Sequence, residues 1–323
     1  MKKAVTVFIT FIMILSLAGC AGFASSKKAP VPSTLRLATG DSAGIYYSFG
    51  EAIAKGVSDN TDVDIVCISE KGSQDNVEAL RDGEAEFAFC QADIMSFAKE
   101  GKRGFEEPVD NFSAVASLYT EMVQIVTLNE NIKTVFDLKG KKVSIGAAGS
   151  GVYYNALDIL EAFELEEADL EPSYKSFSES VDALKSGMID AAFVVAGTPT
   201  TAITDLMESV GNVYFVSIDK NHMEKLLKLS PYYTKCVIPS DVYGTANDIN
   251  VIGVDAVMLA RNEVPENAVY SVCQYLFENA DNLQDIHEKF DEINPDFATK
   301  ITSVPYHSGA AKYFSEKGYS VAH

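Results

Sequence analysis

Residues 79–89 have the sequence ALRDGEAEFAF, and residues 183–193 repeat it with changes as ALKSGMIDAAF. A second pair recurs in the same order, because Gly44-Ile-Tyr-Tyr47 is followed much later by Gly151-Val-Tyr-Tyr154. Two similar segments that recur in the same order, at nearly the same separation along the chain, are typical of an internal duplication. We therefore expect two similar lobes, the alternative being that ordinary βα units merely look alike.

Around both copies the chain alternates between short β-branched runs and stretches with apolar residues at helical spacing. This alternation is typical of parallel sheets covered by helices, so the sequence predicts an α/β fold. The expected strands are 34–39, 63–68, 86–90, 142–145 and 190–195, and the expected helices are 45–57, 74–81, 151–163, 179–185, 265–278 and 310–316.

The last part of the chain, from about Asp255 onward, is too short for a third domain and is expected to complete the first lobe. Two apolar strand-like stretches, 115–128 and 250–259, are candidates for crossings between the lobes. The predicted division is two similar βα domains joined by a hinge, with a cleft between them. Lobe 1 takes residues 34–120 with 255–323, and lobe 2 takes residues 121–254.

The N-terminus carries the features of an export signal: Lys2 and Lys3, an apolar run, and then Leu17-Ala-Gly-Cys20. The run is shorter than the roughly 20 residues that a membrane-spanning helix needs. The stretch resembles the bacterial lipobox, whose cysteine becomes the lipidated first residue. We expect residues 1–19 to be a lipoprotein signal peptide and residues 20–33 a lipidated tether that holds the protein outside the cell membrane. An ordinary signal peptide is the alternative.

Charge and residue composition argue against several classes of partner. The net charge of −20 would repel phosphate backbones, so no nucleic-acid partner is expected. The four histidines show no metal-ligand spacing and no cysteine pair suits zinc, so no metal or other cofactor is expected. Cys67 and Cys90 lie in apolar runs where free thiols are common, and no disulfide is predicted.

Four loops rich in glycine and hydroxyl residues follow the expected strands. In open parallel sheets, ligands bind at the carboxyl ends of the strands, where loops lead into helix N-termini. Glycines let the backbone approach a ligand, and free N–H groups there favour a carboxylate or similar anion. Each loop alone could equally be a helix cap, whereas four together suggest a clamp. The loops are 39–44, 71–76, 146–151 and 196–199.

Each tyrosine pair, 46–47 and 153–154, is expected to direct at most one ring toward a ligand, because consecutive helix positions face different ways.

Gly40-Asp41-Ser42 resembles the nucleophile block of GDS-type serine hydrolases, and Asp219 and His222 have the spacing of their acid and base. Those enzymes also need a Gly-x-Asn-Asp block before the histidine. The nearest candidate, residues 244–248, has one residue too many and follows His222. A serine esterase is therefore kept as an alternative, and no catalytic residue is assigned.

From about residue 35 to residue 318, the chain resembles the TAXI family of extracytoplasmic solute receptors, which serve tripartite ATP-independent periplasmic (TRAP) transporters. The resemblance covers most of the chain in order. Its motifs are ATG and GIYYSFG within 38–50, GS and NVEAL within 72–80, QAD at 91–93, DLKGKKV at 137–143, GSG at 149–151, FVVAGTP at 193–199 and HSGA at 307–310.

The resemblance implies that the chain has a type II periplasmic-binding-protein fold. It also implies that the protein is not an enzyme. It further implies that the two lobes close on a solute, a small carboxylate or amino acid that is glutamate-like or 2-oxoglutarate-like. The protein would then deliver this solute to a membrane permease. A binding protein of an ABC importer or a sensor is the nearest alternative, and a surface adhesin is a third. The implied ligand contacts are Thr39, Ser42, Tyr46, Ser73, Asn76 and Gln91 in lobe 1, with Ser150, Gly151, Gly197 and Thr200 in lobe 2.

Two residues depart from the family pattern, since Asp41 stands where glycine is usual and Ser308 where proline is usual. An aspartate beside the pocket would disfavour a dianion and could pair with a ligand amine, unless it turns outward. An amino acid is thereby favoured over a dicarboxylate. Lys71 could offset the charge of Asp41 or extend into solvent.

Overall fold

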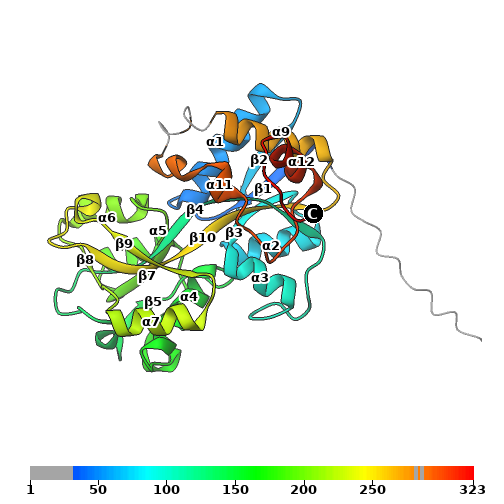
Figure 1. Cartoon of the computed structure of the whole chain (residues 1–323). Helices are drawn as coiled ribbons and strands as arrows, with labels where there is room; N and C mark the ends of the chain where they lie inside the picture. Colours follow the sequence, from blue (N-terminus) through cyan, green and yellow to red (C-terminus); the bar gives the residue numbers. More distant parts are fainter. Residues whose placement is uncertain (1–31, 280–282, 284–286) are drawn as a thin grey trace, which may run out of the picture. The chain divides into compact units, whose positions relative to one another are not determined.

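A ten-stranded mixed sheet forms the centre of the computed structural model, which describes residues 32–279, 283 and 287–323 (Figure 1). The predicted signal peptide, Cys20 and most of the predicted tether lie outside the described residues. The strand order is β2-β1-β3-β10-β4-β7-β5-β6, with β9 beside β10 and β8 beside β4. Within the described part of the chain, no helix combines the length and the apolar character that a bilayer crossing requires.

The first repeat is a βαβαβ unit in which β1 lies between β2 and β3, all parallel. Helix α2 ends at Gly83, whose φ of 75° is the left-handed conformation that stops a helix. A further helix, α3 (Ala92–Glu100), follows the unit. The elements of the unit are β1 (Thr34–Thr39), α1 (Ile45–Asn60), β2 (Asp64–Ser69), α2 (Ser73–Asp82) and β3 (Phe87–Gln91).

The second repeat has the same order and the same pairing, with β5 between β6 and β7. In each half the third strand also pairs antiparallel with a long strand, β10 next to β3 and β4 next to β7. The strand topology therefore repeats, as the two sequence echoes predict. The elements are β5 (Lys142–Ser144), α4 (Gly151–Ala162), β6 (Glu171–Ser173), α5 (Phe177–Lys185) and β7 (Ala191–Ala196).

Two long strands, β4 (Phe112–Thr127) and β10 (Ile249–Arg261), connect the halves (Figure 1). They pair with each other in antiparallel orientation, because one carries the chain out of the first half and the other brings it back. The parallel pairing expected from the alternation of strands and helices holds within each repeat, whereas these two crossing strands pair antiparallel and make the sheet mixed. Both stretches that the sequence nominates for crossings lie largely within them.

The apolar side chains separate into cores on either side of this strand pair. One core draws on residues 35–119 and 256–314, together with Tyr154. Two smaller cores draw on residues between 123 and 254. The C-terminal segment thus packs with the first repeat. The lobe boundaries given above stay a prediction.

Local capping explains where two of the helices begin. Ser176 accepts a hydrogen bond from the backbone N–H of Glu179, and the Glu179 carboxylate accepts one from the N–H of Ser176. This capping box starts α5 at Phe177, two residues before the expected start. His307 accepts from the N–H of Gly309 and starts α12 (Ser308–Glu316).

The remaining elements lie between and after the two repeats, except for the 3₁₀ turn Glu167–Asp169, which lies between α4 and β6. They are α6 (Thr201–Val210), β8 (Tyr214–Phe215), α7 (Lys220–Leu229), β9 (Tyr233–Ile238), α8 (Ser240–Tyr243), α9 (Glu266–Glu278) and α11 (Pro295–Ala298), with 3₁₀ turns at Val135–Leu138, Glu167–Asp169 and Glu288–Glu292.

Candidate functional site

A cavity of about 650 Å³ lies between the two halves. Its walls come from the loops after β1, β2 and β5, the segment before α5, the ends of β3 and β7, and the middle of β4. Three of these loops lead into the helices α1, α2 and α4. The volume lies in the range of small-molecule sites, so the cavity is the candidate ligand site.

Half of the residues that the resemblance nominates lie in the cavity wall. These are Tyr46, Ser73, Gln91, Ser150 and Gly151. They come from both halves and from equivalent places in the two repeats, since Tyr46 lies in the first turn of α1 and Gly151 begins α4.

The other five nominated residues are outside the cavity wall. Thr39 donates a hydrogen bond to the carbonyl of Ile68, and Asn76 donates to the carbonyl of Phe89, so both tie strands and helices together. Ser42 is exposed. For these residues a direct ligand contact stays a prediction.

Thr200 and Gly197 complete that set. The Thr200 hydroxyl donates to the Gly197 carbonyl at 2.7 Å and accepts from the Gln124 amide at 2.9 Å. A Cβ on Gly197 would lie 2.7 Å from Cδ1 of Ile45, which shows how closely the two halves approach there. Gly197 therefore shapes the contact between the halves, and Thr200 holds the loop that contains Gly197.

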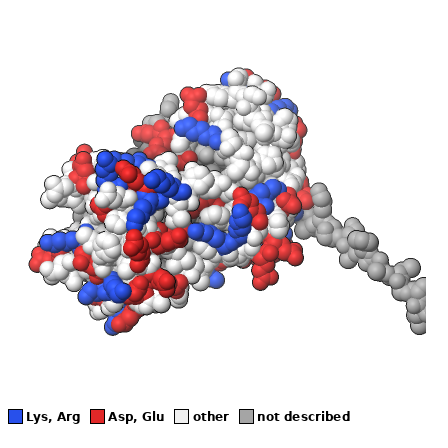
Figure 2. Space-filling model, turned by 60° about the horizontal axis from the view of Figure 1, so that its bottom comes forward, with Lys and Arg blue, Asp and Glu red and all other residues white. Residues whose placement is uncertain are grey.

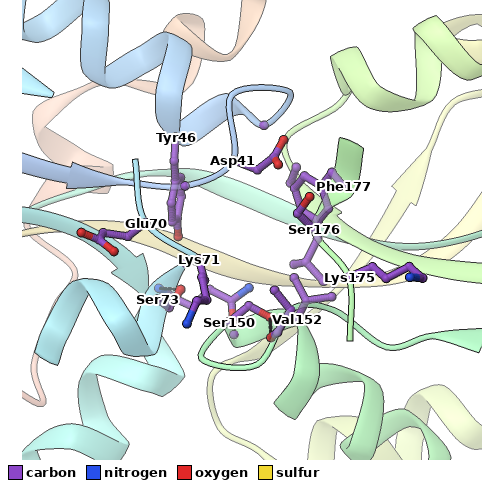
Figure 3. A pocket seen from close by; sticks show the side chains of 18 of the residues that line it. Asp41, Tyr46, Glu70, Lys71, Ser73, Ser150, Val152, Lys175, Ser176 and Phe177 are labelled. Carbon is purple, nitrogen blue, oxygen red and sulfur yellow. Dashed lines mark hydrogen bonds between the residues drawn. The ribbon is translucent and has the colours of Figure 1, made fainter. Parts of the chain in front are cut away.

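One tyrosine of the four faces the cavity. Figure 3 shows the ring of Tyr46 directed from α1 into the cavity. Tyr154 instead donates a hydrogen bond of 2.8 Å to Oε1 of Gln74 in the other half, and Tyr153 donates to Glu167. The expectation of at most one ligand-facing tyrosine per pair agrees with this arrangement.

Glu121, in the middle of β4, is a cavity residue that the sequence reasoning missed. It is 3% exposed, and Tyr46 donates a hydrogen bond of 3.0 Å to its Oε2 atom. Burial raises the pKa of this carboxyl to about 8, against the opposing effect of hydrogen bonds from Tyr46 and Gln91. The available signal was that Glu121 is the one charged residue in the strand-like stretch 112–127.

Gln91, at the end of β3, lies beside Glu121. Its side chain lies beside the Glu121 carboxylate and lowers the pKa of that group, and its backbone N–H donates to the hydroxyl of Ser73 at 3.1 Å. Its Oε1 atom is buried and has no hydrogen-bond partner in the part of the chain that the structure describes. A buried acceptor in this state requires an explanation, and a donor from a bound ligand or an ordered water is one.

Hydrogen bonds close the rim of the cavity. The Ser178 hydroxyl donates to Oδ1 of Asp41 at 2.8 Å, across the two halves. The same oxygen accepts from the backbone N–H of Ala43, so Asp41 also orders its own loop. On another side, the N–H groups of Gln74 and Asp75 both donate to the carbonyl of Gly149 at 3.1 Å. The first turn of α2 is thus capped by the opposite half.

The charged groups of the cavity wall are mainly acidic. Burial raises the pKa of Glu70, and Lys71 forms an ion pair of 3.5 Å with Asp75. In Figure 3 the Glu70 and Lys175 side chains extend to opposite sides of the view, away from Tyr46. On the outer face in Figure 2, by contrast, acidic and basic groups are interspersed. The charged residues of the wall are Asp41, Glu70, Glu121, Glu179, Lys71 and Lys175.

A second group of polar contacts joins the halves away from the cavity wall. Asn155 on α4 donates to Asp93 on α3 at 3.0 Å, and Arg103 forms an ion pair of 2.7 Å with Asp158. Tyr233 donates to Asp158 at 2.6 Å. Burial raises the pKa of Asp93 to about 7, the nearby charge of Asp158 also contributing.

The residues that suggested an esterase are not gathered at the cavity. His222 pairs with Asp219 and stacks on Phe163, with ring centroids 3.7 Å apart. The cavity wall includes neither His222 nor Ser42. Among the described residues, no three potential metal ligands lie close enough together to hold a metal ion. All four cysteines of the described chain are free thiols.

Two βαβαβ units joined by a pair of crossing strands, with a ligand-sized cavity between them, define the type II periplasmic-binding-protein fold. The chain belongs to the NMT1-like family, whose model matches residues 37–318.

Solved structures support the fold assignment. The methylphosphonate complex of PhnD1 from Prochlorococcus marinus matches with a TM-score of 0.52 at 12% identity, covering 81% of this chain and 89% of that one. The GluR0 ligand-binding core of Nostoc punctiforme, in complex with L-glutamate, matches with a TM-score of 0.50 at 16% identity, covering 80% and 100%. A putative L-cystine ABC transporter from Listeria monocytogenes matches at 0.50 and 15% identity, covering 84% and 100%. At these identities the likeness shows the fold alone.

Proposed function

We propose that this protein is an extracytoplasmic solute receptor of the TAXI type, which captures a small carboxylate or amino acid and delivers it to a TRAP-type membrane permease. It is anchored to the cell membrane through a lipid on Cys20. The solute is bound and released without chemical change, so the protein is not an enzyme.

The observation that carries this proposal is the origin of the cavity wall. Equivalent loops of the two repeats, after β1 and after β5, both contribute to it. A solute in the cavity touches both halves only when they are together, so binding energy favours the closed arrangement. This is how a receptor converts occupancy into a shape that a permease can recognise.

The choice of permease rests on the motifs quoted above, from ATG at 38–40 to HSGA at 307–310. The alternative, a binding protein of an ABC importer, is favoured by the neighbour described as a putative L-cystine ABC transporter. The two alternatives differ in energy source. Uptake that stops when the ion gradient is collapsed, at constant ATP, supports a TRAP permease, whereas uptake that follows ATP supports an ABC importer.

Binding itself is tested with the full-length protein after unfolding and refolding have removed any co-purified solute. A ligand at 100 times its dissociation constant adds about 2.7 kcal/mol to the free energy of unfolding and raises the melting temperature. Amino acids, dicarboxylates, keto acids and sugars form the panel. A rise with one small acid supports the receptor, and no rise with any compound counts against it.

A further inference from the structure

The buried end of the cavity contains a carboxyl group that has no cation beside it among the residues the structure describes. Glu121 accepts a hydrogen bond from Tyr46 and lies beside the side chain of Gln91, and both of these residues are neutral. Over the described residues, none of the ion pairs includes Glu121. A buried carboxylate is costly unless a positive charge and further donors accompany it. A cationic group from outside the chain would supply both.

A second acceptor lies at the same end. Oε1 of Gln91 is buried without a partner among the described residues, and the Gln91 side chain lies beside Glu121. A Cβ on Gly151 would lie 2.1 Å from this oxygen, so only glycine at position 151 leaves the oxygen its space. The Glu121 carboxylate and Oε1 of Gln91 are thus two adjacent acceptors, and a ligand group with several N–H donors could bond to both.

The remainder of the wall is poorly suited to a ligand with two negative charges. Recognition of carboxylates commonly uses a bidentate arginine, and no arginine is among the described residues of the wall. Of the two lysines, Lys71 already pairs with Asp75. Asp41, which the sequence suggested as an amine partner, is engaged by Ser178 and Ala43.

We propose that Glu121 and Oε1 of Gln91 bind the ammonium group of the solute, and that the solute is an amine-bearing molecule of net charge zero or above. This inference rests on the proposed function as a solute receptor and narrows its substrate class. Dicarboxylates and 2-oxo acids are excluded because they bring neither a cation for the Glu121 carboxylate nor an N–H donor for Oε1 of Gln91. Tyr46 positions the Glu121 carboxylate by its hydrogen bond.

The test uses matched pairs of probes on the full-length, ligand-stripped protein. Each L-amino acid is paired with its 2-oxo acid, and putrescine and agmatine represent amines without a carboxylate. We expect at least one amine to raise the melting temperature and its deaminated partner to bind about 100-fold more weakly or worse. This comparison needs no variant, so a folding defect cannot obscure it.

Glu121→Gln then tests the residue. It keeps the shape and the hydrogen bond from Tyr46 and removes the charge, so affinity for the amine should fall about 100-fold. Glu208→Gln, on the exposed surface of α6, is the matched control and should bind as the wild type does. Circular dichroism establishes that both variants are folded.

The outcomes separate the two proposals. If a 2-oxo acid or dicarboxylate binds as tightly as the amines, or Glu121→Gln binds the amine unchanged, the ammonium site is wrong while the receptor function stands. If no probe of either kind binds, the receptor function fails, and the ammonium site with it.

Discussion

The Ser178 hydroxyl donates a hydrogen bond of 2.8 Å to Oδ1 of Asp41, joining α5 of the second repeat to the loop that precedes α1 in the first. Because the bond crosses the cavity rim, it exists only while the halves are together. It therefore contributes to the closed arrangement and not to the fold of either half.

Ser178→Ala should consequently speed release of the solute without slowing its capture. A hydrogen bond to a charged group contributes about 1.5–3 kcal/mol, and partial exposure places this one at the lower end. We expect the dissociation rate to rise about tenfold in stopped-flow fluorescence, with an unchanged association rate. Ser209→Ala, whose hydroxyl bonds only to Asp205 in its own helix, is the control. Equal release rates for the two variants would contradict a contribution of the Ser178–Asp41 hydrogen bond to the closed arrangement.

Gly149→Ala should prevent closure. Gly149 has a φ of +86°, and a Cβ there would lie 1.9 Å from Oδ1 of Asp75 in the other half. Gly187→Ala is a matched control, because its φ is +68° but nothing lies within 4 Å of the added atom. The control carries only the backbone strain, about 1–2 kcal/mol. We expect solute affinity to fall more than 100-fold for Gly149→Ala alone, and solution scattering with solute present to show a larger radius of gyration.

Proton uptake and release should accompany binding at Glu121. With its pKa raised to about 8, the carboxyl is mostly protonated at pH 7 in the empty site. An ammonium ligand requires the carboxylate, so binding releases a proton, and affinity rises between pH 6 and pH 8. Calorimetry in phosphate and in Tris, which differ in ionisation enthalpy, measures this release. Equal binding enthalpies in the two buffers would contradict it. The groups that interact electrostatically with Glu121 are Tyr46, Cys90, Gln91, Asp93, Tyr119 and Asp255.

The free energy of unfolding of the ligand-free protein should fall as pH rises, opposite to the rise in ligand affinity. Glu121 and Asp93 both have folded-state pKa values above their unfolded values. Between about pH 4.5 and pH 8 the folded state therefore binds more protons, and the free energy of unfolding decreases as pH rises. Urea unfolding at pH 5 and pH 8 measures the decrease. Glu121→Gln should flatten the dependence, since its neutral amide cannot ionise, and an unchanged slope would contradict the assignment.

The part of the fold predicted from sequence follows from patterns that are local. The two echoes at 79–89 and 183–193 specify a helix end, a tight turn at glycine and a buried strand, and these recur in both halves. The antiparallel pairing of β4 with β10 was missed because it joins segments more than 130 residues apart, for which local periodicity carries no information.

The candidate site was predicted less completely for a related reason. A hydroxyl or amide in a loop can face a ligand or a neighbouring carbonyl, and Thr39 and Asn76 face carbonyls. Glu121 lies within a strand, where loop-based reasoning does not look. Its importance depends on burial, and burial at this position follows from the approach of Tyr46 on α1.

The lipid anchor is tested at Cys20, which lies outside the described residues. Cys20→Ser removes the only thiol that the lipobox resemblance nominates, so the protein should no longer incorporate labelled fatty acid and should leave the membrane fraction. Cys236→Ser, at a half-buried position on β9, should stay lipidated and membrane-bound. Labelling of the Cys20 variant would show that the anchor is elsewhere.

Arg103 should matter for closure although it is outside the cavity wall. Its guanidinium pairs at 2.7 Å with Asp158, whose side chain is 2% exposed, and the two residues belong to opposite halves. When the halves open, water solvates both charges. In Arg103→Met, Asp158 therefore lacks a compensating cation only when the halves are closed, so the substitution destabilises the closed state and not the open one. We expect solute affinity to fall about tenfold, with little change in the urea midpoint of the ligand-free protein. Lys139→Met breaks the exposed pair with Asp169 within one half and should leave affinity unchanged. Because both variants remove one positive charge, an equal loss of affinity would assign the effect to net charge, and a loss confined to Arg103→Met assigns it to the contact between the halves.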